Sequence, residues 1–278
     1  MVPPAKTIPV TGRTTFDEML ENYRIQALGL IEGGSDYLLI ETSQDTLNIK
    51  AATLGSLAAM RELGRHVPMA VSGTIEPMGT MLAGQSVDAL YASLEHLDLL
   101  AIGLNCATGP AFMTDHIRSL SEISERFVSC VPNAGLPDEY GRYNESPEKV
   151  AQTLAKFADH GWVNMVGGCC GTTAEYVRAI ARVMEGKKPR TPVAGRTSRV
   201  SGIEFLSLEE ENRPIIVGER TNVIGSRKFK QLIQEEKFEE AAEIARKQVR
   251  GGAVIIDVCL ADPDRNELDD MNIFLDKG

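Results

Sequence analysis

The sequence lacks the features that mark membrane, secreted and nucleic-acid-binding proteins. No apolar run approaches the roughly 20 residues of a membrane span, and the opening stretch MVPPAKTIPV lacks the apolar core of a signal peptide. Basic residues number 29 against 39 acidic ones, which gives a net charge of −10 at pH 7. Nucleic acids and anionic membranes bind basic surfaces, so neither is an expected partner. These absences predict a cytoplasmic protein.

Cysteine is also scarce, and its distribution does not resemble a disulfide framework. Five cysteines are scattered along 278 residues. In a reducing compartment, clustered thiols more often indicate a metal site or catalysis. Cys169 and Cys170 are adjacent, within the stretch VGGCCGTT. Successive side chains of a strand point to opposite faces, so this pair can serve one target only if the glycines bend the backbone.

What the sequence does contain is a repeated alternation of strand-like and helix-like segments. Apolar, strand-like runs end in small or polar residues and are followed by helical periodicity, as in 46–63 and in 147–161 with Gly161 as its C-cap. This order predicts an α/β fold with a parallel sheet. The polar residues of interest fall at the carboxyl ends of the strands, the rim where α/β barrels build their active sites. The predicted strands are 36–42, 68–74, 99–106, 127–133 and 163–170.

The character of the sequence changes near Lys187. Residues 191–212 are rich in Pro, Gly, Ser and charge with little periodicity, which predicts a linker that packs in part. A second βαβ-like pattern follows, with strand-like runs at 214–222 and 253–264 around a charged amphipathic helix at 238–249. We therefore predict a first domain at 1–190, a linker at 191–212 and the start of a second domain at 213–278.

Three cysteines end two of the predicted strands. Cys106 ends one strand, and Cys169 and Cys170 end another that is separated from it by a single β-α unit. Their side chains can meet at one rim, and three thiolates with an open fourth position are what a catalytic zinc centre needs. Thr172 and Glu175 have the spacing of a capping box, which places Cys170 just before a helix amino terminus whose dipole favours a thiolate. Cys130 and Cys259 are interpreted as ordinary apolar residues.

Three motifs, GLNCATGP, PNAGLP and VGGCCGTT, give a family resemblance. In this order and spacing they resemble the homocysteine S-methyltransferase domain, a zinc-bearing (β/α)8 TIM-type barrel, over residues 14–190. The stretch from VGERTN to GAVIIDV resembles the start of a second TIM-type barrel, the pterin-binding methyltetrahydrofolate domain. The two occur in tandem in cobalamin-dependent homocysteine methyltransferases.

The resemblance implies a function and a set of site residues. It implies transfer of a methyl group to homocysteine, forming methionine, from methylcobalamin that is recharged by 5-methyltetrahydrofolate. Zinc would activate the homocysteine thiol, so no protein general base is assigned. A cobalamin-binding domain or protein is the implied partner. The residues that match family positions are Cys106, Cys169 and Cys170 for zinc, Glu41, Asn105, Gly73 and Thr74 for homocysteine, and Glu219, Asn222 and Asp257 for folate.

The sequence departs from the family in two respects. Run 36–42 resembles the fourth barrel strand, so strands 4 to 8 are expected, together with only the first βαβ part of the second barrel. We therefore expect an incomplete barrel, a fragment whose other strands could come from another chain. The second departure is Cys259, where the family often has asparagine.

Two other functions stay open at this point. One is a homocysteine methyltransferase that uses betaine or a methylsulfonium donor, although such enzymes need no pterin barrel. The other is a zinc-binding but catalytically inert scaffold that requires a partner chain.

Overall fold

The computed structural model describes residues 14–195 and 197–277. The segment 1–13, where the sequence predicts no signal peptide, lies outside the described residues. The chain divides into two compact units between Ser207 and Leu208. This division falls inside the predicted 191–212 linker, and the predicted domain bounds themselves stay predictions. None of the described helices combines the length and the apolar character needed to span a bilayer.

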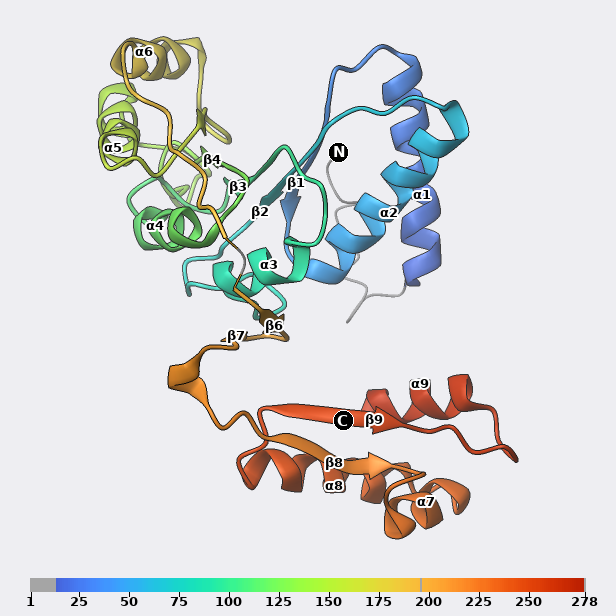
Figure 1. Cartoon of the computed structure of the whole chain (residues 1–278). Coiled ribbons are helices and arrows are strands. Elements are labelled where there is room, and N and C mark those ends of the chain that lie inside the picture. Colours follow the sequence, from blue (N-terminus) through green and yellow to red (C-terminus); the bar gives the residue numbers. More distant parts are fainter. Residues whose placement is uncertain (1–13, 196, 278) are drawn as a thin grey trace. The chain divides into compact units, whose positions relative to one another are not determined.

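The first unit alternates helices with strands of one parallel sheet, which confirms the predicted α/β class (Figure 1). The strands are hydrogen-bonded in the sequential order β1-β2-β3-β4-β5. A two-stranded antiparallel hairpin follows. The elements are α1 (Phe16–Glu32), β1 (Leu38–Ser43), α2 (Thr46–Leu63), β2 (Met69–Gly73), α3 (Val87–Leu94), β3 (Ala101–Asn105), α4 (Thr114–Ile123), β4 (Phe127–Val131), α5 (Pro147–Asp159), β5 (Met165–Val166), α6 (Ala174–Met184), β6 (Arg199–Ser201) and β7 (Phe205–Ser207).

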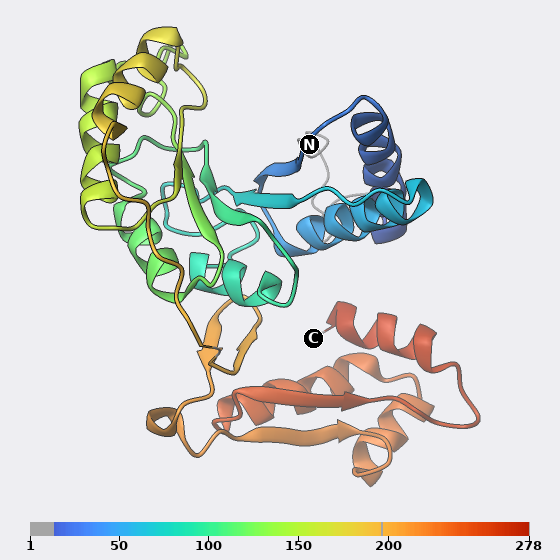
Figure 2. The same ribbon diagram turned by 45° about the horizontal axis from the view of Figure 1, so that its top comes forward.

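The two faces of this sheet differ in what they contact. Val71 is paired with Ile40 and Ile102, and these three side chains are fully buried in the main apolar core. Gly73 lies on the same face, because a Cβ there would be 2.6 Å from Leu90 of α3. Strand alternation therefore places Glu41 and Asn105 on the opposite face, at the carboxyl ends of β1 and β3. Figure 2 shows the strands side by side with helices flanking them.

The predicted elements match the structure best where the local signals are strong. The helix predicted at 46–63 is α2, with Asp45 as its N-cap and Gly64 beyond it in the left-handed conformation. The helix predicted at 147–161 ends earlier, at Asp159. His160 occupies the C-cap, and Gly161 is the next residue, with φ 70°. The fifth strand, β5, is much shorter than its predicted range of 163–170, because the chain turns after Val166.

The hairpin formed by β6 and β7 occupies part of the predicted linker and packs on α3. Arg199 forms an ion pair with Glu95 at 2.9 Å, with only 9% of the arginine side chain exposed. The Ser201 hydroxyl donates a hydrogen bond to the Ala89 carbonyl at 2.9 Å. These contacts hold residues 199–207 on the first unit.

The second unit contains a pair of parallel strands joined through two helices. Sequence reasoning expected one helix between the strands, and the structure forms two, separated by a tight turn at which Glu236 has φ 56°. Phe229, Ile233 and Phe274 are buried in its separate core. The elements are the 3-10 turn η1 (Glu210–Asn212), β8 (Val217–Asn222), α7 (Arg227–Gln234), α8 (Phe238–Arg250), β9 (Ile255–Cys259) and α9 (Glu267–Lys277).

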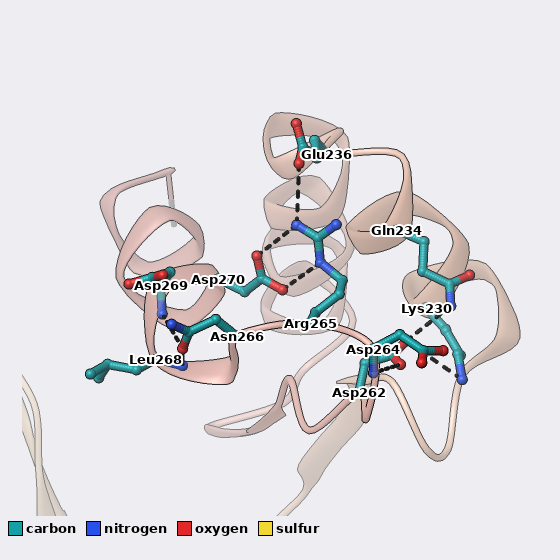
Figure 3. Close-up of polar contacts among 10 residues, drawn as sticks. All are labelled: Lys230, Gln234, Glu236, Asp262, Asp264, Arg265, Asn266, Leu268, Asp269 and Asp270. Atoms are coloured by element: carbon teal, nitrogen blue, oxygen red, sulfur yellow. Dashed lines mark hydrogen bonds and ion pairs between the residues drawn. The ribbon is translucent and has the colours of Figure 1, made fainter.

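A polar network fixes the loop between β9 and α9 (Figure 3). Arg265 binds the Asp270 carboxylate through two nitrogens, at 2.6 and 2.8 Å, and only 5% of the aspartate side chain is exposed. Asp262, with 1% of its side chain exposed, accepts a hydrogen bond from Gln234 of α7 at 2.9 Å. The loop is therefore held by charges that are largely shielded from water.

We expect Arg265→Ala to weaken the docking of α9. The Asp270 carboxylate is nearly buried, and the substitution removes the arginine that binds it through two nitrogens. Such a loss lowers the free energy of opening by about 2 kcal/mol, even though the arginine is partly exposed. Hydrogen exchange of the α9 amides measures this as a lower free energy of local opening. The matched control is Arg250→Ala, which breaks an exposed pair with Glu243 and should change opening by no more than about 0.5 kcal/mol. Equal effects of the two substitutions would contradict this account.

Candidate metal and substrate site

Three cysteine sulfurs converge at the carboxyl end of the sheet. The Sγ atoms of Cys106 and Cys170 are 3.7 Å apart, those of Cys169 and Cys170 are 3.9 Å apart, and all three lie within 4.8 Å of one another. Among the described residues this is the one group of three or more His, Cys, Asp or Glu side chains spaced to hold a metal ion. Cys106 and Cys169 are half-buried, and Cys170 is exposed.

Cys106 reaches this point because the chain leaves strand geometry at the end of β3. Cys106 and Ala107 have φ of 63° and 57°, which is uncommon for residues that are not glycine. In a continued strand Cys106 would point to the helix-covered face, opposite to Asn105. The turn is held by the Cys106 amide, which donates to Val131 at 3.2 Å, and by the Thr108 amide, which donates to the Cys106 carbonyl at 2.7 Å. This local backbone strain accompanies the placement of a sulfur at the rim.

Cys169 and Cys170 lie in a turn. Strand β5 ends at Val166, and the Thr172 amide donates to the Cys169 carbonyl at 3.1 Å, closing a four-residue turn. Gly171 has φ 79°, and a Cβ there would lie 2.3 Å from the ring of Tyr143. Glycine is therefore required both for the backbone angle and for the space. Adjacent thiols can face one target because the turn replaces the strand that the sequence predicted at 163–170.

The predicted capping box is wrong. The N-cap of α6 is Thr173, whose hydroxyl accepts a hydrogen bond from the Glu175 amide at 3.3 Å. Thr172 instead donates its hydroxyl to the Cys169 carbonyl at 2.6 Å. Because the Thr172 hydroxyl is used in the cysteine turn, the next residue, Thr173, caps the helix. Cys170 still lies just before the helix amino terminus, as the sequence predicted.

The electrostatics of the cluster favour a thiolate before any metal binds. Hydrogen bonding with the Cys169 thiol, against the opposing effect of burial, lowers the pKa of Cys106 to about 5. The same interaction, together with burial, raises the pKa of Cys169. The coupled pair of Cys106 and Cys169 therefore favours a state in which one sulfur is a thiolate and the other thiol donates to it.

The donor set fits zinc. Sulfur ligands about 2.3 Å from a tetrahedral zinc ion lie about 3.8 Å from one another, which is close to the 3.7 and 3.9 Å separations of the two measured pairs. Soft thiolate ligands select zinc over magnesium or calcium. Three protein ligands would leave one position of a tetrahedral ion open.

Asn105 connects the cluster to the end of β1. Its side chain is 1% exposed. Its Oδ1 accepts a hydrogen bond from the Thr42 amide at 3.0 Å, and its Nδ2 donates to the Thr42 hydroxyl at 2.8 Å and to the Cys169 sulfur at 3.8 Å. Thr42 directly follows Glu41, which is half-buried on the face that Asn105 occupies. Asn105 therefore links two of the predicted substrate and metal positions.

The other two residues predicted for homocysteine lie in β2 and just beyond it. The Thr74 hydroxyl, which is buried, donates to the Asn105 carbonyl at 3.2 Å. Thr74 thus supports the strand end that precedes Cys106. Gly73 faces Leu90 of α3, so only its backbone is available to the rim.

Sequence reasoning missed two residues of the site. Asn133 Oδ1 accepts a hydrogen bond from the Cys170 amide at 3.0 Å, and its side chain contributes to the lowered pKa of Cys106. Asn133 ends a predicted strand, so the strand-end rule that identified Cys106 could have identified it as well. Tyr143 comes from an irregular loop, and no sequence pattern indicates its position.

The remaining two cysteines are not members of this cluster. Cys130 is fully buried in the core, where burial raises the pKa of its thiol, as expected for an inert apolar cysteine. Cys259 is half-buried at the end of β9 in the second unit.

The residues predicted for folate gather on β8 and β9. Asn222 Nδ2 donates to the Asp257 carboxylate at 2.9 Å, and the Asn222 side-chain oxygen accepts from the amides of Ile224 and Gly225. Glu219 is exposed. All three predicted residues line a cleft of about 770 Å³, to which Arg220 and Gln248 also contribute.

Comparison with known proteins gives matches to two families in tandem. Residues 2–184 match the family described as homocysteine S-methyltransferase, and residues 218–274 match the family described as pterin binding enzyme. A methionine synthase from Mycobacterium leprae (strain TN) is 40% identical over 277 residues, which covers 96% of this chain and 23% of that protein. One from Mycobacterium tuberculosis (strain ATCC 25618 / H37Rv) is 38% identical over 272 residues, with the same coverage. The chain thus spans less than a quarter of the length of these relatives.

A solved structure shares the fold of about two thirds of the chain. The apo form of the homocysteine methyltransferase MmuM from Escherichia coli aligns with a TM-score of 0.50 and 18% identity, covering 66% of this chain and 60% of that one. The match of the first family extends over more than half of the chain and contains all three converging cysteines. The chain belongs to the homocysteine S-methyltransferase family.

Proposed function

We propose that the protein transfers a methyl group to homocysteine to form methionine, with 5-methyltetrahydrofolate as the donor and methylcobalamin as the carrier. The observation that carries this proposal is the convergence of three cysteine sulfurs beside Asn105 and the Glu41 strand end. The tandem order of the two family matches and the similarity to two methionine synthases support it. The second match favours a folate donor over betaine or a methylsulfonium compound, which require no pterin-binding domain.

Cys106, Cys169 and Cys170 are the residues that would hold zinc. When bound, zinc supplies Lewis acidity that keeps an incoming thiol deprotonated near neutral pH. The protein contributes the charge and the positions of the three ligands, and it needs no general base. Catalysis by these residues consists mainly of aligning the substrate sulfur with the methyl carbon.

Glu41 is proposed to bind the ammonium group of homocysteine. Its carboxylate lies at the end of β1, one residue from the Asn105 contact and on the same face of the sheet. A half-buried carboxylate attracts an ammonium group more strongly than an exposed one does, because water screens the pair less. Asn105, Thr74 and the Gly73 backbone shape the neighbouring wall.

The folate domain is proposed for the second unit. Asn222, at the carboxyl end of β8, and Asp257, in the middle of the parallel strand β9, already form a hydrogen-bonded pair. Amide and carboxylate groups of this kind can bind the donor and acceptor edge of a pterin ring. Glu219 lines the same cleft, which is large enough for a ring system.

We propose further that the five-stranded sheet is an arc of a (β/α)8 barrel, comprising its fourth to eighth strands. Sequential parallel order and helices that follow the strands in turn support this assignment. The two strands of the second unit are proposed as the first βαβ part of another such barrel. The carboxyl ends of the strands then form one rim in each barrel.

The proposed function is tested with the zinc-loaded full chain, homocysteine and free methylcobalamin. We expect demethylation of methylcobalamin that depends on homocysteine. Glu41→Gln should raise the KM for homocysteine about 10- to 100-fold, because a charge-assisted hydrogen bond contributes about 1.5–3 kcal/mol. Zinc content should not change, since Glu41 is not a sulfur ligand.

The control for this test is Glu148→Gln, which alters an exposed acid in the first turn of α5 and should leave KM unchanged. If Glu41→Gln retains the KM of the unaltered chain, Glu41 does not bind the substrate. If the zinc-loaded chain never turns over, the inert scaffold is the better description.

A further inference from the structure

Tyr143 contacts the cysteine cluster from outside the sheet. Its ring lies against the backbone of Gly171, the residue that follows Cys170, so closely that any Cβ there would overlap the ring. The phenol lies close enough to Cys170 for the charge of that sulfur to act on it. Burial, followed by the charge of Cys170, raises the pKa of the phenol. A phenol is protonated at neutral pH in any case and can donate a hydrogen bond.

The loop that carries Tyr143 is built as a rigid support. Asp138 Oδ1 accepts hydrogen bonds from the amides of Tyr140 and Arg142, both at 2.9 Å. Its Oδ2 accepts from the Arg142 side chain at 3.1 Å and from Asn144 at 3.2 Å. A single carboxylate thus closes the turn from 138 to 142 and presents the next residue, Tyr143, to the cluster.

The end of this loop is fixed to the rim as well. The Glu145 amide donates to the Ala134 carbonyl at 3.1 Å, and the Tyr176 hydroxyl of α6 donates to the Glu145 carbonyl. The Ala134 amide in turn donates to the Cys170 carbonyl at 2.9 Å. Tyr143 is therefore held between the Asp138 turn and the Glu145 contact with Ala134, whose own amide is bonded to Cys170.

We propose that Tyr143 is a positioning residue of the metal site, whose phenol donates a hydrogen bond to the Cys170 sulfur and so fixes the most exposed of the three ligands. The inference rests on the zinc site proposed above. Asn105, at the end of β3, plays the same part for Cys169, because its side-chain amide donates a hydrogen bond to the Cys169 sulfur. Hydrogen bonds to ligand sulfurs orient them and withdraw electron density, which tunes the metal.

Tyr143→Phe tests this role, because it removes the hydroxyl and keeps the ring against Gly171. Without the donor, Cys170 is less fixed and more electron-rich. We expect zinc affinity, measured by competition with a chelator, to fall about 10- to 100-fold. In the cobalt-substituted chain, the sulfur-to-metal charge-transfer absorption should move to lower energy.

The matched control is Tyr140→Phe in the same loop, where the side chain is 73% exposed and does not contact the cluster; it should change neither readout. Zinc retained after all three cysteines are changed would overturn the site itself. If zinc requires the cysteines but Tyr143→Phe leaves affinity and absorption unchanged, only the role of Tyr143 is overturned. A fall in affinity without the absorption shift also overturns it, because packing alone would explain that result.

Discussion

Replacement of Cys106, Cys169 and Cys170 by serine is expected to abolish zinc binding. The unaltered chain should bind about one zinc ion. The serine hydroxyl does not ionise near neutral pH and is a poor ligand for a metal that prefers thiolate. Structural zinc sites in zinc-finger peptides bind the ion with roughly 10–16 kcal/mol, supplied by their ligands, so losing all three ligands here should leave no measurable site. Each single replacement should lower affinity at least about 100-fold.

Metal analysis after dialysis measures this effect. Cys259→Ser is the matched control, because Cys259 is a half-buried cysteine of the second unit and is outside the cluster. It should retain the full zinc content. Zinc that persists at the same stoichiometry in the triple variant would mean that other residues hold the metal, and the assignment of the site would be wrong.

The second large effect is expected from Gly103→Ala in the middle of β3. A Cβ at this position would lie 2.0 Å from the Ser129 Oγ and 2.2 Å from the Ser129 carbonyl oxygen on the neighbouring strand. The carbonyl cannot rotate away, so β3 and β4 must separate. We expect a loss of about 3 kcal/mol, a large fraction of the 5–15 kcal/mol that stabilises a typical domain. Asn105 and Cys106 follow two and three residues later, so zinc affinity should fall as well.

Urea unfolding followed by the fluorescence of Trp162 measures this loss, since the sequence contains one tryptophan and it packs in the first unit. Gly29→Ala is the control. Gly29 lies within α1, and no atom lies within 4 Å of an added Cβ, so alanine should stabilise by about 0.5–1 kcal/mol. An unchanged urea midpoint for Gly103→Ala would refute the close approach of the two strands.

Elements with clear local signals were predicted more accurately than elements whose ends depend on tertiary contacts. The helix predicted from periodicity at 46–63 coincides with α2, whose ends are set by Asp45 as the N-cap and Gly64 as the C-cap. The strand predicted at 163–170 does not coincide with β5, because the run is apolar only as far as Val166 and then forms a glycine turn. Apolar character alone does not distinguish a strand from the approach to a turn.

By itself, the sequence determined the α/β class and the meeting of Cys106 with Cys169 and Cys170. Both follow from periodicity and from the rule that parallel strands end at one edge. Only the tertiary structure decided that Cys106 leaves the strand through a left-handed turn, that Thr173 rather than Thr172 caps α6, and that Asn133 and Tyr143 contact the cysteines. These features depend on hydrogen bonds and close contacts between segments distant in the chain, and no local pattern records them.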